Sequence, residues 1–512
     1  MARYIDPDFE QDKFIAISFS EQILPGSFEY ALCYIVDHYI DTSVFDAKYN
    51  NDQTGRLAYD PAILLKIVLY AYAKGIVSSR QIEYSCRKNV NFMAISADTQ
   101  PHFTTIASFV SGMSDEVIHL FRDVLAYCDY LGLIGKDMFA IDGCKLPSNA
   151  SKEKSGTQAD FEKKVKRLEA AAQRIIEKHK EQDKKDADSS IKEKEEIYVE
   201  KLNKEVAKLK QWLKNNEDKP GRTGKPRKSN MTDNESAYMK SSNGYIQGFI
   251  GVGAVDPQHQ IVVNAEAFGE AQEHQLLQPM IEGIQANFQA TSHGENIFST
   301  AILTADSGFH TEDNIRYLYD NEIEGYVADT LFRKRDPKFA DAEKYQEHKK
   351  VRRSKELEPK FNPSDFDYDP VKRTCVCPAG KSLYRSGSGR QRGLISDRYK
   401  APKRACTGCH LRKRCLKNPE KTAIRQVAFF NGQAEGQPET YTSKMKQKID
   451  SDKGRHIYSK RLGTVEPVFG NLQNKGMDRF TLRSKKKVDT QWKLYCMVHN
   501  IEKINNYGLA FS

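Results

Sequence analysis

Two short apolar segments of the sequence end in the same way, at an aspartate followed by small, turn-forming residues. Residues 138–141 lead into Asp142, and residues 301–305 lead into Asp306. Apolar runs of this length bounded by turn residues are typical of buried strands. Because side chains at the ends of neighbouring strands meet at one edge of a sheet, both carboxylates are expected at the same edge. This pattern predicts a sheet that carries both acids at one edge.

The segments around the two aspartates alternate between strand and helix patterns. Residues 245–255 and 261–265 predict a β-hairpin with turn residues between them. A helix over 274–284, kinked at Pro279, is predicted next. The strand at 301–305, a helix around 314–318 and a strand at 325–328 follow. Together these elements predict an α/β fold with a mixed sheet flanked by helices.

Residues 1–135 are predicted to be helical. Pro61 opens an apolar run over 63–72 with the spacing of a buried helix face, and further helices are predicted after Ser78 and around 104–109. Short helices joined by tight turns favour a helix-turn-helix DNA-binding domain. A small helical bundle with no role in DNA binding is the alternative.

Residues 151–230 form a strongly charged segment with an intermittent apolar stripe. The stripe predicts an antiparallel helical hairpin inserted into the main domain, interrupted at 183–190. Its basic exit at 219–227 is a candidate contact for DNA phosphates. A solvated linker is the alternative interpretation.

A third acid, Glu466, stands beside an apolar stripe of helical spacing that includes Val465, Val468 and Leu472. A lone glutamate in such a place is more often a salt-bridged surface acid. Its occurrence after two strand-end aspartates favours a shared site instead. Three clustered carboxylates repel one another by several kcal/mol at an effective dielectric constant of about 20, so they require protons or cations between them.

Hard oxygen ligands in this arrangement suit Mg²⁺ or Mn²⁺. Two such ions ~4 Å apart activate a water molecule or a 3′-hydroxyl group and stabilise the leaving oxygen of a phosphodiester. Asp142, Asp306 and Glu466 are therefore the candidate catalytic and metal-binding residues. Either aspartate could instead cap the turn that follows it.

Five of the ten cysteines lie between Cys375 and Cys415, among Pro, Gly, Lys and Arg. In a reducing compartment such a cluster favours metal binding over disulfides. The candidate ligands of one structural Zn²⁺ are Cys375, Cys377 and Cys406 with either Cys409 or Cys415. His410 is a further candidate, and unliganded surface thiols are the alternative.

The formal net charge of +10 favours a polyanionic partner. No apolar run reaches the roughly 18 residues that a membrane-spanning helix needs. The N-terminus lacks the apolar core of a signal peptide. The protein is therefore expected in the cytoplasm, without a membrane partner.

The segments around Asp142, Asp306 and Glu466 (Phe-Ala-Ile-Asp-Gly, Leu-Thr-Ala-Asp-Ser-Gly-Phe and Val-Glu-Pro-Val-Phe-Gly) resemble the three motifs of bacterial insertion-sequence DDE transposases. Residues 492–501 resemble the closing helix of that family. The resemblance extends from about residue 59 to residue 503. It implies an RNase H-like catalytic fold, with the three acids as its metal-binding triad. It also implies metal-dependent cleavage at transposon ends, followed by strand transfer.

Tyr458 and Arg461 resemble a Tyr-x-x-Arg element that contacts DNA phosphates in related transposases. This chain has one extra residue between Arg461 and Glu466, and Gln473 stands where relatives often have Lys. A glutamine can bond a phosphate but cannot neutralise its charge. The full set of candidate DNA contacts is Tyr458, Arg461, Gln473, Arg479 and Arg483.

The expected organisation has four parts. They are an N-terminal helical domain (1–135), the first part of an RNase H-like domain (136–340), an insertion (341–450) with a cysteine-rich knuckle at 375–415, and C-terminal helices completing the catalytic domain (451–512). The resemblance implies double-stranded DNA, both transposon ends and target, as the partner. It also implies a homodimer or larger assembly during synapsis, and a bacterial, nucleoid-associated location.

Three other functions fit parts of the pattern. A domesticated relative would bind DNA without catalysis, although binding alone does not require clustered carboxylates. A metal-dependent nuclease would cut without joining. A zinc-knuckle scaffold protein would be indifferent to loss of Asp142.

Overall fold

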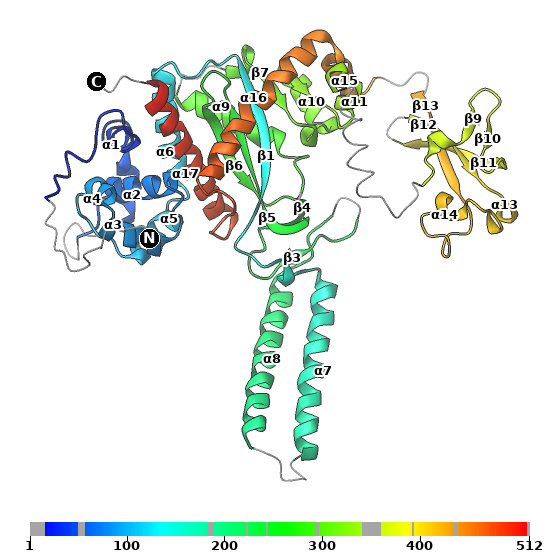
Figure 1. The fold of residues 1–512 in the computed structure, drawn as a ribbon, viewed down its shortest axis with the longest axis horizontal. Coiled ribbons are helices and arrows are strands. Elements are labelled where there is room, and N and C mark those ends of the chain that lie inside the picture. Colours follow the sequence, from blue (N-terminus) through cyan, green and yellow to red (C-terminus); the bar gives the residue numbers. More distant parts are fainter. Residues whose placement is uncertain are drawn as a thin grey trace, which may run out of the picture. The chain divides into compact units, whose positions relative to one another are not determined.

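The structure is a computed structural model that describes residues 16–49, 57–182, 189–221, 224–241, 244–291, 296–339, 360–391, 394–433 and 439–508. The chain forms two compact units, one of Met1–Thr330 with Ser451–Ser512 and the other of Leu331–Asp450 (Figure 1). Most of the predicted interruption at 183–190 lies outside the described residues, as do residues 222 and 223 of the basic exit.

The N-terminal part of the first unit is helical, as predicted. Its α-helices are α1 (Phe28–His38), α2 (Pro61–Ala73), α3 (Ser79–Lys88), α4 (Val90–Ile95), α5 (Phe103–Gly112) and α6 (Glu116–Tyr130). Helix α2 begins at Pro61, where the Asp60 carboxylate accepts a hydrogen bond from the Ala62 amide. Its residues from Leu64 to Tyr72 are all buried, so α2 is the core of this helical region.

A six-stranded mixed sheet follows. Its strands are β1 (Met138–Pro147), β4 (Ala237–Ser241), β5 (Gly244–Val255), β6 (Val262–Phe268), β7 (Ile302–Ala305) and β8 (Gly325–Val327). The strand order is β4-β5-β1-β7-β8, with β6 also paired to β5. Strands β1, β7 and β8 are parallel, whereas β5 is antiparallel to β1 and β6. The predicted mixed sheet and its hairpin are confirmed.

The sequence pattern predicted that strand β1 ends at Asp142, and this prediction is wrong. It continues to Pro147 because its other edge stays paired with β5, from Ala140 opposite Val255 to Pro147 opposite Gly248. Only the pairing with β7 stops, at Ile141 opposite Ala305. Asp142 therefore lies within β1 but just beyond the parallel ladder.

Helices pack around the sheet. They are α9 (Leu277–Thr291), α10 (Glu312–Asp320), α16 (Asp452–Asn474) and α17 (Lys485–Lys503). Helix α9 begins at Leu277 and not at His274 as predicted, which places Pro279 in the first turn. Proline is tolerated there because its missing N–H has no intrahelical partner.

Helix α17 lies between β6 and the N-terminal helices α2 and α6. Trp492 on this helix is fully buried, and its indole N–H donates to the Val252 carbonyl at 2.9 Å. The ring lies against Gly251, where a Cβ atom would approach the indole to 3.0 Å. A glycine on β5 thus permits the close contact between helix and sheet.

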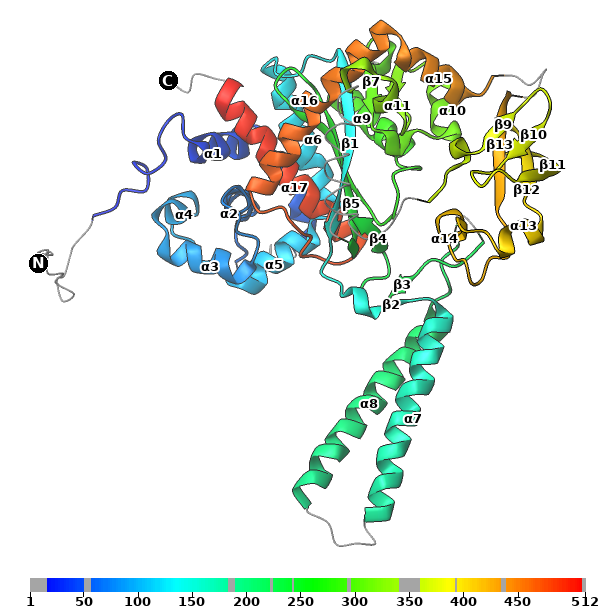
Figure 2. The same cartoon turned by 45° about the vertical axis from the view of Figure 1, so that its right-hand side comes forward.

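The charged segment consists of α7 (Gln158–Gln182) and α8 (Ser189–Asn215), which lie side by side in both views (Figures 1 and 2). Their apolar contact includes Phe161, Val165, Val206 and Leu209. Strands β2 (Ser155–Gly156) and β3 (Ser229–Asn230) pair at the base of the two helices.

The second unit contains a five-stranded antiparallel sheet in the order β13-β12-β11-β10-β9. Its elements are α11 (Phe332–Arg335), β9 (Asp367–Asp369), β10 (Thr374–Val376), β11 (Ser382–Gln391), β12 (Leu394–Lys400), α13 (Lys403–Thr407), α14 (Arg412–Cys415), β13 (Gln426–Gln433) and α15 (Tyr441–Asp450). In neither unit is any described helix long and apolar enough to cross a membrane.

Candidate active site

The register of the sheet brings Asp142 and Asp306 to neighbouring positions. Ile141 and Ala305 are the last residues paired between β1 and β7, and each aspartate immediately follows one of them. The chain at Asp306 turns at once into a short 3₁₀ helix over Ser307–Phe309. The observed register therefore places the two aspartates next to each other, immediately beyond the paired residues of the parallel strands.

Both carboxylates contact one guanidinium group, that of Arg461 on α16. Its Nη1 donates to Asp142 Oδ2 at 2.7 Å, and its Nη2 donates to Asp306 Oδ1 at 3.4 Å. The Arg461 side chain is only 4% exposed, and its Nε has no hydrogen-bond partner in the described part of the chain. One buried cation therefore joins the two acids.

Two opposing influences act on the charge of Asp142. Burial favours the neutral carboxyl group, whereas the hydrogen bonds that it accepts favour the charged carboxylate. Burial raises the pKa of Asp142, Arg461 lowers it, and the nearby charge of Asp306 raises it further. The Gly143 amide also donates to Asp142 Oδ1 at 2.8 Å, which favours the charged form. The net effect is a raised pKa at a group held by an arginine.

Glu466 lies on the same helix as Arg461, five residues further along. In an α-helix this corresponds to a rise of about 7.5 Å and a rotation of roughly 140°. Its side chain is exposed, and it forms no hydrogen bond or ion pair with any described residue. The apolar stripe beside it is buried at Val465, Val468 and Leu472, as predicted.

The sequence interpretation missed an acid, Glu273, which lies in the turn between β6 and α9. Burial raises the pKa of Glu273 to about 7. Lys145 and Arg461 oppose the shift, and the charges of Asp142 and Asp306 add to it. Its position follows no strand or helix pattern. One feature of the sequence could have indicated a third acid nearby. Gly143 and Gly308, which follow the two aspartates, have no side chain and therefore leave room for that of another residue.

The other predicted DNA contacts differ in their surroundings. The Tyr458 ring centroid lies 5.6 Å from the Arg461 guanidinium carbon, beside the two aspartates. Gln473 and Arg479 are exposed. Arg483 donates to the Asn149 carbonyl at 3.0 Å. Arg461 itself faces the aspartates, and its contact with DNA stays a prediction.

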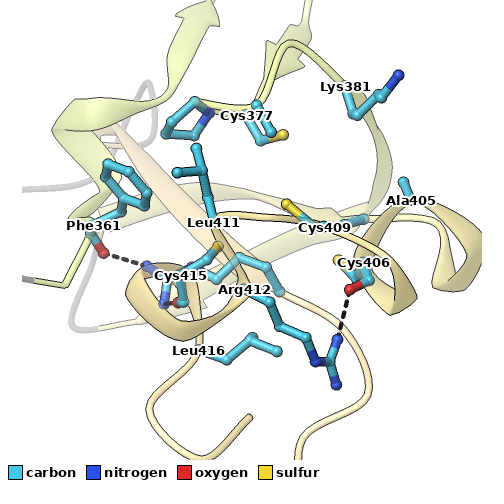
Figure 3. Close-up of a pocket in the computed structure, with 14 residues that line it drawn as sticks. Phe361, Cys377, Lys381, Ala405, Cys406, Cys409, Leu411, Arg412, Cys415 and Leu416 are labelled. Atoms are coloured by element: carbon cyan, nitrogen blue, oxygen red, sulfur yellow. Dashed lines mark hydrogen bonds between the residues drawn. The ribbon is translucent and has the colours of Figure 1, made fainter.

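In the second unit, four of the five clustered cysteines line one pocket of about 30 Å³. Cys377 follows β10, whereas Cys406, Cys409 and Cys415 come from α13, α14 and the turn between them (Figure 3). Burial raises the pKa of Cys415, and the other three thiols are near enough to influence it.

The fifth cysteine has a different environment. Cys375 is fully buried in the core of the second unit, which also contains Phe366, Leu383, Tyr399, Ala401 and Val427. It does not line the pocket, and neither does the exposed His410. Four of the five candidate thiols therefore line the pocket and Cys375 does not, although Cys377, Cys406 and Cys415 also pack against its core.

Backbone contacts shape the cysteine pocket. Cys377 and Gly380 form a tight turn in which the Gly380 amide donates to the Cys377 carbonyl at 2.8 Å, and Gly380 has a φ of +70°. Arg412 Nη1 donates to the Cys406 carbonyl at 2.8 Å, and Arg425 Nη1 donates to the Cys415 carbonyl at 3.1 Å. These contacts hold the segments that present the thiols.

As the side chains are placed, no three or more His, Cys, Asp or Glu residues in the described ranges are grouped so as to hold a metal ion. The chemical nature of the candidate ligands nevertheless suits metal ions. Carboxylate oxygens are the ligands of Mg²⁺ and Mn²⁺, and four thiols are a common ligand set of Zn²⁺. Binding at either place requires the side chains to move closer together.

Comparison with known families gives two matches. Residues 376–505 match the family model described as Transposase DDE domain, and residues 18–112 match the model described as Transposase domain (DUF772). The first range includes Arg461 and Glu466, whereas Asp142 and Asp306 lie outside both ranges. In a comparison with curated proteins, nothing matches the chain. The chain thus contains two separate regions that match transposase domains, one N-terminal and one C-terminal.

Proposed function

We propose that the protein is a DDE transposase, which cuts DNA at transposon ends and joins the freed ends to a target. The observation that carries the proposal is the placement of Asp142 and Asp306 directly after the last paired residues of the parallel strands β1 and β7, in contact with the buried Arg461. The two transposase-domain matches support the same class of protein. The mixed sheet with an antiparallel hairpin supports the RNase H-like fold that the sequence resemblance implies.

Asp142 and Asp306 would hold the divalent cations, Mg²⁺ or Mn²⁺, and Glu466 would complete the triad. The two aspartates are adjacent, and the Glu466 carboxylate has no competing partner among the described residues. When bound, the cations polarise the phosphodiester and its attacking hydroxyl group. Without metal, Arg461 offsets part of the repulsion between the two neighbouring carboxylates, because its guanidinium contacts both.

The reaction has two displacements at phosphorus. In the first, a water oxygen forms a bond to the phosphorus at the transposon end, the bond to the 3′ oxygen breaks, and that oxygen leaves as a 3′-hydroxyl group. In the second, this 3′-hydroxyl oxygen attacks a phosphorus of the target, whose own 3′ oxygen leaves. The carboxylates hold the reacting groups in place; binding and orientation supply much of the acceleration in such transfers.

DNA binding is assigned to the predicted contact residues Tyr458, Arg461, Gln473, Arg479 and Arg483. The net charge of +10 supports a polyanionic partner. The helices of residues 1–135 are proposed as a DNA-binding domain, and a dimer or larger assembly is proposed for synapsis of two ends. A bacterial cytoplasm, at the nucleoid, is the matching location.

The pocket thiols Cys377, Cys406, Cys409 and Cys415 are proposed as the ligands of one structural Zn²⁺. Four thiols from two segments would close a tetrahedral shell and fix the small second unit. Cys375, one of the predicted ligands, is replaced in this set because it is packed in the apolar core.

The test is cleavage of duplex DNA taken from both flanks of the gene, with Mg²⁺, by the full chain. The wild type is expected to nick and join these duplexes. Asp142→Asn, Asp306→Asn and Glu466→Gln should each abolish cleavage and leave DNA binding intact. Retained cleavage in one variant would remove that residue from the site, and cleavage retained in all three would end the proposal. Cleavage without joining would favour the nuclease alternative, and binding without cleavage the domesticated relative.

A further inference from the structure

Glu273 is packed against the backbone next to both aspartates. A Cβ atom built on Gly308 would lie 1.9 Å from Glu273 Oε2, and one built on Gly143 would lie 3.3 Å from Oε1. Gly143 directly follows Asp142, and Gly308 is two residues after Asp306. The carboxylate of Glu273 therefore reaches the same edge of the sheet from a third segment of the chain.

The segment that presents Glu273 is fixed to the turn after Asp306. His274 Nδ1 lies 2.9 Å from the Gly308 carbonyl oxygen. The buried Asn314 side chain donates to the His274 carbonyl at 2.9 Å and to the Phe309 carbonyl at 2.8 Å. These contacts set the distance between Glu273 and the aspartate turn, so its location does not depend on a loose loop.

The local charges do not balance. Arg461 is the cation bonded to Asp142 and Asp306, but the Glu273 carboxylate has no hydrogen bond or ion pair with any described residue. Lys145 and Arg461 are both near enough to influence Glu273, but no hydrogen bond or ion pair joins either of them to its carboxylate. A half-buried carboxylate beside two others is unfavourable unless it takes up a proton or a cation lies close to it.

We infer that Glu273 is a further carboxylate ligand of the divalent cations held by Asp142 and Asp306, in addition to Glu466. The inference rests on the proposed function, because it assumes metal binding at the two aspartates. Movement of the three side chains toward the ion is required, since they are not grouped for binding as placed.

The inference is tested by Mn²⁺ binding to the full chain without DNA, measured by calorimetry and by the Mn²⁺-induced rise in melting temperature. Glu273→Gln keeps the shape of the side chain and removes its charge. It should weaken Mn²⁺ binding at least about tenfold and reduce the Mn²⁺-induced rise. The matched control is Glu270→Gln in the same turn, because Glu270 pairs with Arg227 and not with the aspartates. This control should bind Mn²⁺ as the wild type does.

The outcomes separate the inference from the proposed function. Unchanged Mn²⁺ binding in Glu273→Gln, with loss of binding in Asp142→Asn, would overturn the role of Glu273 and leave the transposase site intact. Equal binding in the wild type and an Asp142→Asn, Asp306→Asn double variant would overturn the metal site itself. In EDTA, Glu273→Gln should melt no lower than the wild type, since it removes an unpaired charge. A lower melting temperature there would show a structural carboxylate and overturn the inference.

Discussion

Arg461 Nη1 donates to Asp142 Oδ2 at 2.7 Å, across 319 residues of sequence. The arginine lies on α16 and the aspartate on β1, so this contact joins α16 to the sheet. Both side chains are largely buried, with exposed fractions of 4% and 20%. A pair of this kind, shared with Asp306, links the stability of the fold to the charge of the site.

Replacing Arg461 should destabilise the metal-free protein. Arg461→Met leaves the largely buried Asp142 and the more exposed Asp306 without their cation, and breaking a buried pair such as Arg461 with Asp142 costs about 3–5 kcal/mol. Urea denaturation in EDTA measures the loss, and added Mg²⁺ should recover part of it. Arg316→Ala is the control, because its partner Asp313 is 87% exposed and such pairs contribute about 0–1 kcal/mol. Equal losses in both variants would contradict the prediction.

Gly308→Ala should disturb the site by displacing Glu273. The new Cβ atom would lie 1.9 Å from Glu273 Oε2, so the carboxylate must move. Overpacking of this kind costs about 1–3 kcal/mol. Gly470→Ala on α16 is the comparison, because nothing lies within 4 Å of its Cβ position, and it should stabilise by about 0.5–1 kcal/mol. Thermal melts of both variants measure the difference. A lower melting temperature in Gly308→Ala alone would show a steric clash with Glu273, whereas a lower melting temperature in both would contradict this explanation.

His499 should make the fold sensitive to acid. This histidine is 1% exposed; its Nδ1 lies 2.9 Å from Asn471 Nδ2, and its Nε2 lies 2.9 Å from the Gln260 carbonyl. A neutral ring satisfies both contacts, donating from Nε2 and accepting at Nδ1. Burial lowers the pKa of His499 from 6.5 to about 4.

The sign of the effect follows from this depressed pKa. Between pH 6.5 and 4 the unfolded chain binds the proton and the folded chain does not. The stability is therefore complete above pH 6.5 and is lost as the pH falls toward 4, by at most about 3 kcal/mol. Denaturation of wild type and His499→Gln across this range measures the difference. Parallel stability curves would contradict the prediction.

The cysteines should separate in a zinc assay. Cys377→Ser should lower the zinc content of the purified full chain, because Cys377 lines the pocket. Cys375→Ala should retain the zinc and lose about 1 kcal/mol of stability, since Cys375 is fully buried among apolar side chains. Elemental analysis and a thermal melt of each variant provide the two readings. Loss of zinc from Cys375→Ala alone would reverse the assignment.

DNA binding should weaken steeply with salt. Each phosphate neutralised by Lys or Arg contributes about 0.9 to the slope of log affinity against log salt. Fluorescence anisotropy between roughly 50 and 200 mM salt measures the slope. A flat response would be inconsistent with phosphate contacts by this cationic chain.

The two aspartates were predictable because the signal is local. An apolar run followed by Asp and Gly or Asp and Ser-Gly predicts a strand and its end, and neighbouring parallel strands then bring the acids together. The extent of β1 beyond Asp142 was not predictable in this way. It depends on continued pairing with β5, a segment about one hundred residues away in the sequence.

Arg461 and Glu273 show where local patterns are insufficient. The direction of Arg461 depends on how α16 crosses the sheet, which its sequence does not determine. Glu273 lies in an irregular turn, so neither helical nor strand spacing marks it. The start of α9 could have been predicted correctly, because Pro279 is better accommodated in the first turn of a helix than in its middle.

The small β2–β3 pair has a consequence for the charged helices above it. Ser155 is opposite Asn230, and Ser155 Oγ donates to the buried Gln247 side chain of β5 at 2.8 Å. The chain thus leaves the central domain at β2 and returns to it at β3. These two strands pair with each other, and β2 is bonded to β5, so their positions do not depend on α7 and α8. Turns can be added to or removed from both helices in register without displacing β5, so this arm is a module whose reach evolution or an engineer can alter while the neighbouring chemistry is preserved.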